Sequence, residues 1–108
     1  MRNWNVGASR SVDALVTALC LDFSRRERAI KDGSASKRTL TEFRYLNFKI
    51  VEAVAEIVED RYVRLYIKEI GENVGYAKSK SEGLGETLYK TRKKTIKENI
   101  ARKLHLLD

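Results

Sequence analysis

The sequence predicts an all-α fold, a compact bundle of about four helices in a single domain covering residues 1–108. The chain has no proline, so no position forces a break inside a helix. Its apolar residues recur every three or four positions over long stretches, which is the spacing of one face of a helix. A chain of 12.4 kDa is large enough for one modest core and too small for two.

The first expected helix comes after a flexible arm, residues 1–8, from which Trp4 is expected to dock on the body. Ser9 or Ser11 is expected to cap this helix, because serine hydroxyls accept hydrogen bonds from the first free backbone amides. Apolar residues at helical spacing then carry the helix to near Ile30. The run Asp-Gly-Ser-Ala-Ser after it is the clearest connector in the sequence.

The second expected helix is capped by Thr39 or Thr41, with Glu42 as a capping-box partner for Thr39. Its apolar stripe runs to Ile57 and is the widest in the chain, which marks this helix as central to the packing. Residues 9–58 together are therefore interpreted as a helical support for the C-terminal part of the chain.

A third helix is expected to begin at Asp60, as its cap, and to end between Gly71 and Gly75. No glycine or proline separates the second helix from the third. The sequence therefore leaves open whether the two form one bent helix.

The last helix is expected to begin near Gly85, and residues 59–108 are interpreted as a helix-turn-helix-like unit. At 100° per residue, this helix gathers its large apolar residues on one arc: Leu88, Tyr89, Ile96, Ile100, Leu104 and Leu107. The opposite arc is polar and mostly basic: Thr87, Lys90, Thr91, Lys94, Glu98 and Arg102. Such a helix buries one face and leaves the other free to meet a partner.

The net charge of +7 is concentrated around this last helix. Residues 76–108 hold nine Lys and Arg against four Asp and Glu, a balance of +5, whereas residues 1–75 hold thirteen against eleven, a balance of +2. A basic surface of this kind attracts a polyanion by neutralising phosphates and releasing counterions. A lysine-rich face that is merely solvated is the other interpretation.

The residue inventory argues against most site chemistry. With one cysteine and one histidine, the chain has neither the ligands of a Cys/His zinc site nor an intramolecular disulfide. Cys20 is expected in the core. The carboxylates of Glu52, Glu56, Glu59 and Asp60 fall on adjacent helical turns, where an ion-paired surface is favoured over an acid/base pair. We therefore expect no catalytic residues, no metal and no cofactor, and hence no enzyme.

Neither a membrane span nor a signal peptide is recognisable in the sequence. The expectation is a cytoplasmic protein without membrane contact.

A helix, a glycine-containing connector and a basic helix have the layout of a helix-turn-helix reader, whose second helix enters the major groove of double-stranded DNA. Threonine hydroxyls and lysine amines on its first turns can reach base edges or phosphates. Residues in the connector and on the sides of the helix can hold the DNA backbone. The candidate DNA-binding residues are Lys78, Lys80, Ser81, Thr87, Lys90, Thr91, Lys93, Lys94 and Lys97.

Two segments of the last helix, residues 87–96 (TLYKTRKKTI) and 100–106 (IARKLHL), carry a resemblance. They resemble the C-terminal recognition helix of ArpU/RinA-type phage transcriptional regulators, which is itself similar to the promoter-reading helix-turn-helix of sigma factors. In that family the turn is usually tight, whereas the connector 75–85 is longer here. The resemblance implies a DNA-binding regulator of phage or prophage type, with RNA polymerase as a candidate partner.

A second class of function stays open. The wide stripe of the second helix, with Tyr45, Phe48, Tyr62 and Tyr66 around it, is more apolar surface than a small monomer covers. The alternative is thus a helical interaction or assembly subunit, a homodimer without DNA binding. A homodimer is also compatible with DNA binding, because two-fold symmetry matches palindromic half-sites.

Overall fold

The computed structural model describes residues 6–79 and 82–107, and throughout this part of the chain every regular element is a helix. The elements are α1 (Val6–Leu21), α2 (Phe23–Asp32), α3 (Lys37–Ala55), α4 (Asp60–Gly71), the 3₁₀ turn η1 (Tyr76–Lys78) and α5 (Glu86–Lys103). The predicted all-α bundle is confirmed. The described residues hold five α-helices instead of the four expected, because the first expected helix is two.

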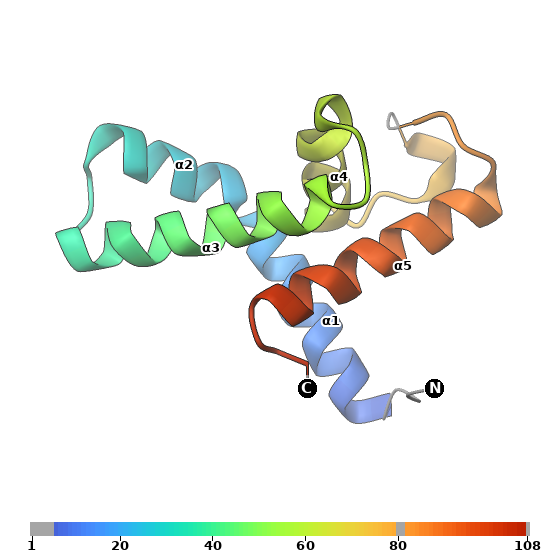
Figure 1. Cartoon of the computed structure of the whole chain (residues 1–108), viewed down its shortest axis with the longest axis horizontal. Helices are drawn as coiled ribbons and strands as arrows, with labels where there is room; N and C mark the ends of the chain where they lie inside the picture. The colour runs from blue at the N-terminus through green and yellow to red at the C-terminus, as the bar shows by residue number, and fades with distance from the viewer. Residues whose placement is uncertain (1–5, 80–81, 108) are drawn as a thin grey trace.

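The break between α1 and α2 falls at Asp22, so the prediction of one helix running to Ile30 was wrong. The backbone of Asp22 has φ −86° and ψ 1°, outside the helical region, and the chain changes direction there (Figure 1). At the other end, α1 begins at Val6, before the expected caps. Residues 1–5, with Trp4, lie outside the described residues.

A buried arginine holds this break. Arg26 is 2% exposed, and its guanidinium reaches back from α2 to donate to the carbonyl of Leu19 in α1. Its Nε donates to Oδ1 of Asn47 in α3 at 2.6 Å, and the amide of Asn47 donates to the carbonyl of Phe23 at 3.2 Å. One side chain therefore ties the end of α1 and the start of α2 to the middle of α3.

α2 and α3 form a hairpin through the predicted connector, in which Gly33 adopts a left-handed conformation with φ 63°. The cap of α3 is Ser36, whose Oγ accepts a hydrogen bond from the backbone amide of Thr39 at 3.2 Å. The expected caps Thr39 and Thr41, and the role given to Glu42, were therefore wrong. Ser36 caps the helix three residues before Thr39, the earlier of the two caps predicted from the sequence.

α3 and α4 are separate helices, which answers the question that the sequence left open. Glu59 occupies the N-cap position of α4 in an extended conformation, and Asp60 is the first helical residue. The carboxylate of Asp60 lies in the first turn, where negative charge is favourable.

The core lies where α1, α3, α4 and α5 meet. α4 packs mainly on α1, and α5 crosses α3 while contacting α1 (Figure 1). Cys20 is buried as predicted, and burial raises the pKa of its thiol to about 12. The largest fully buried apolar side chains are Val16, Ile50, Val54, Tyr66, Ile67, Ile70, Ile96 and Ile100.

α4 does not end because of Gly71, which is its last helical residue. The left-handed residue that ends it is Asn73, with φ 54°, after which the amide of Val74 donates to the carbonyl of Glu69 at 2.9 Å. α5 ends in the same way at His105, with φ 61°. Asparagine tolerates this conformation better than histidine does.

Replacing His105 with glycine is expected to raise the free energy of unfolding by about 1 kcal/mol, because glycine adopts positive φ without steric cost. His105 is exposed, so little packing is lost. Urea unfolding followed by circular dichroism measures the change. Asn73→Gly is the matched control and should give a smaller gain. A loss of stability in His105→Gly would contradict the assigned helix end.

Candidate nucleic-acid interface

α5 begins at the predicted place. Gly85 is its N-cap, and its first turn lies at one end of the molecule, far from the connector between α2 and α3 (Figure 1). The helix is not enclosed on all sides, since its buried side chains are confined to one face. The side chains buried on α5 are Tyr89, Ile96, Ile100 and Ala101.

The predicted apolar arc of α5 was wrong at Leu88, which is 62% exposed. At 100° per residue, Tyr89 and Ile100 lie within about 40° of Ile96, whereas Leu88 lies about 80° from Ile96 on the other side. The buried face also includes Ala101, so it is turned away from Leu88 relative to the arc drawn from the sequence. Leu88 adds an apolar side chain to the exposed surface of the first turns.

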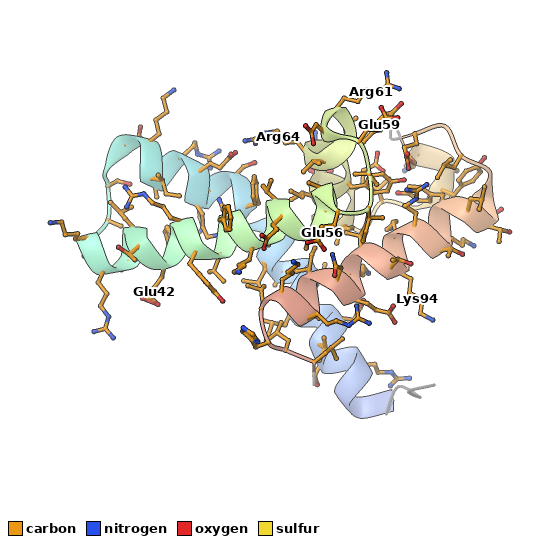
Figure 2. All side chains as sticks on the ribbon, in the orientation of Figure 1. Glu42, Glu56, Glu59, Arg61, Arg64 and Lys94 are labelled. Atoms are coloured by element: carbon orange, nitrogen blue, oxygen red, sulfur yellow. The ribbon has the colours of Figure 1, made fainter. Side chains whose placement is uncertain are left out.

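The polar face of α5 is where the sequence placed it. Thr87, Lys90, Thr91 and Lys94 are all exposed, and their spacing puts them in two adjacent rows along the first half of the helix. Lys90 forms an exposed ion pair with Glu86 at 2.7 Å. Lys94 extends outward from α5 and has no ion-pair partner among the residues that the structure describes (Figure 2).

The remaining candidate DNA-binding residues differ in whether their side chains already contact other parts of the protein. Lys93 donates from Nζ to the carbonyl of Val74 at 2.8 Å, and burial, with the nearby charge of Lys97, lowers its pKa. Lys97 forms an ion pair with Asp13 of α1 at 3.0 Å. Both lysines thus already hold neighbouring segments to α5. Lys78 is exposed in η1, and Lys80 and Ser81 lie outside the described residues.

A polar network that the sequence did not reveal fixes the connector against α4 and α5. Glu69 is 5% exposed on α4, and its Oε1 accepts from the hydroxyls of Tyr89 and Ser79, each at 2.9 Å. The hydroxyl of Tyr66 donates to Glu82 at 2.9 Å. Burial raises the pKa of Tyr89 to about 12. The network sets the position of the first turns of α5.

Replacing Tyr89 with phenylalanine is expected to lower the free energy of unfolding by about 2 kcal/mol, because the buried carboxylate of Glu69 loses a hydrogen-bond donor. The ring and its packing are retained. Urea unfolding gives the value, with Tyr76→Phe as the control, since Tyr76 is half exposed. Equal stability of Tyr89→Phe and the parent would contradict the network.

Three of the four carboxylates that the sequence grouped, those of Glu52, Glu56 and Glu59, form ion pairs, as the sequence favoured. Glu56 accepts from Lys103 of α5 at 2.6 Å, and Glu52 lies 3.6 Å from Lys49. Glu59 pairs with Arg61 at 3.3 Å at the start of α4, at the top of the view in Figure 2. No group of three metal-binding side chains occurs in the described residues.

Two aromatic side chains of α3 remain at the surface. Phe48 is 62% exposed and Tyr45 is 46% exposed, and the ammonium of Lys49 lies over both rings at 5.9 and 5.8 Å. Tyr66, which the sequence grouped with them, is fully buried. The exposed pair keeps homodimerisation as the alternative prediction.

No family model, curated protein or solved structure matches this chain. Among the helices that the structure describes, none combines the length and the apolar composition needed to cross a bilayer.

Proposed function

We propose that this chain binds double-stranded DNA through the exposed face of α5 and acts as a transcriptional regulator of phage or prophage type. The observation that carries the proposal is the row of exposed hydroxyls and amines on the first half of the helix, Thr87, Lys90, Thr91 and Lys94. The helix is about 27 Å long, and its outer face is free along the turns that bear these residues. A major groove about 12 Å wide accepts one helix.

Two further observations support the proposal. The charge balance of +5 in residues 76–108 places the excess of positive charge around α5. The segment also resembles the recognition helix of ArpU/RinA-type regulators. In this proposal Thr87 and Thr91 face base edges, while Lys90 and Lys94 contact phosphates.

The connection between α4 and α5 differs from the short turn of a standard helix-turn-helix DNA-binding motif. Residues 72–85 separate the two helices, and α5 rests mainly on α3. The proposal therefore depends on the exposed polar face of α5 and not on a tight turn between α4 and α5. The network around Glu69 takes the place of that turn in holding α5 against α4.

A fluorescence anisotropy titration with labelled duplexes of mixed sequence tests the proposal. We expect binding at micromolar protein or below in ~50 mM salt, and an affinity that falls steeply by ~200 mM salt as counterions return to the phosphates. No binding at micromolar protein in low salt would overturn the proposal.

A further inference from the structure

A cleft of about 590 Å³ lies between α1 and α5. Arg10 and Asp13 line it from α1, α5 supplies the opposite wall, and Gly75 and Tyr76 of the connector also line it. This volume is within the range of sites that enclose small organic ligands. The cleft is too small to hold a duplex, so its occupant differs from the DNA proposed above.

The walls of the cleft are strongly basic. Five cationic side chains line it against two carboxylates, those of Asp13 and Glu98. The cations are Arg10, Lys90, Lys93, Lys94 and Lys97. Burial, and then the nearby charge of Lys97, lower the pKa of Lys93. A bound anion relieves repulsion of this kind, because it supplies the opposite charge to both groups.

The inner surface of the cleft is apolar. Val16 is fully buried, Tyr89 nearly so, and Val12 is partly buried beside them. The ring of Tyr76 is 39% exposed and lies 5.9 Å from that of Tyr89. An exposed ring beside an apolar floor can cover the face of a flat or aliphatic ligand.

We propose that this cleft binds a small organic anion, a carboxylate or phosphate group attached to an apolar body. The charged group lies among the lysines of α5, and the body packs on the accessible parts of Val12 and Tyr76. Inorganic anions lack the part that fills the apolar floor. Neutral apolar molecules lack the part that meets the lysines.

The cleft and the proposed DNA surface share Lys90 and Lys94. A bound anion is therefore expected to weaken DNA binding, and this one consequence rests on the proposed function. Binding of the anion itself does not depend on DNA. Titrations without DNA consequently test the cleft alone, and failure of either proposal leaves the other standing.

The test is isothermal titration calorimetry of the whole chain with four probes. They are 2-naphthoate, adenosine monophosphate, inorganic phosphate and 2-naphthylmethanol, which vary the anion and the apolar body separately. We expect 2-naphthoate or adenosine monophosphate to bind at one site, at least roughly tenfold tighter than phosphate and 2-naphthylmethanol. Preference for the first indicates a carboxylate ligand, and preference for the second indicates a phosphate ligand. Binding of both organic anions no tighter than the controls would overturn the proposal.

A matched pair of charge reversals locates the site. Lys94→Glu is expected to weaken the better anion roughly tenfold, because it places a negative charge in the wall of the cleft. Arg102→Glu makes the same charge change at an exposed position of α5 outside the cleft and should leave affinity within about twofold. Equal effects of the two variants would overturn the assignment to this cleft. Amide chemical-shift changes should centre on Val12, Val16 and Tyr76.

Discussion

Replacing Gly71 with alanine is expected to lower the free energy of unfolding by about 3 kcal/mol, although the same change inside an ordinary helix is stabilising. A Cβ at this position would lie 2.5 Å from the backbone nitrogen of Leu21 and 2.8 Å from the carbonyl carbon of Cys20. Both atoms belong to backbone, so neither can turn aside as a flexible side chain would. Accommodation requires α1 and α4 to move apart.

Gly75→Ala is the matched control, because a Cβ there has no neighbour within 4 Å and its φ is negative. This variant should be neutral or slightly stabilising. Urea unfolding followed by circular dichroism compares the two. Equal stabilities would mean that α1 and α4 do not approach this closely. Because α1 forms one wall of the cleft, Gly71→Ala should also weaken binding of the organic anion.

Replacing Arg26 with alanine is expected to cost about 4 kcal/mol of unfolding free energy. The substitution removes two charge-assisted hydrogen bonds, to the buried Oδ1 of Asn47 and to the partly buried carbonyl of Leu19. It also leaves a cavity where a large side chain was 2% exposed. A domain of this size has about 5–15 kcal/mol of stability in total, so the loss is severe.

The neighbouring Arg25 provides the control. It forms an exposed ion pair with Asp22 at 2.8 Å, and such solvent-screened pairs contribute little to stability. Thermal and urea unfolding of Arg25→Ala and Arg26→Ala should therefore differ widely. Arg26→Lys should lie between them, since one ammonium replaces the fork of a guanidinium. If both alanine variants were equally stable, Arg26 would not fix the break at Asp22.

The parts of the fold that depend on local pattern were predictable. The start of α5, its exposed basic row and the connector at Gly33 follow from periodicity and turn residues that lie close together in sequence, whereas the helix ends at Lys103, before Leu107 of the predicted arc. The break at Asp22 could not be predicted from local pattern, because no glycine or proline marks it. Its cause is a contact of Arg26 with Asn47, 21 residues further along the chain. An arginine in a basic cluster gives no local signal of burial.

The cleft and the network around Glu69 also could not be predicted from residues that lie close together in the sequence. Each joins residues from separate helices and from the connector, whose approach depends on how α1, α4 and α5 pack. Glu69 between the apolar residues Ile67 and Ile70 was the one available signal, since a carboxylate on a buried face requires donors. The exposure of Leu88 was missed because the arc drawn from the sequence extended to a residue about 80° from Ile96 around the helix, and local spacing does not show which residues at the edge of an arc are covered.

DNA binding through α5 is tested most directly by the salt dependence of binding for Lys90→Ala/Lys94→Ala, compared with Lys31→Ala/Lys37→Ala. Both pairs remove two exposed lysines, but Lys31 and Lys37 lie beside the connector between α2 and α3, at the opposite end of the molecule (Figure 1). Anisotropy titrations across ~50–200 mM salt give the slope of affinity against salt concentration. We expect the α5 pair to weaken binding and to reduce the slope by about 2, while the control pair leaves both nearly unchanged. Equal slopes and affinities for the two variants would contradict DNA binding through this face of α5.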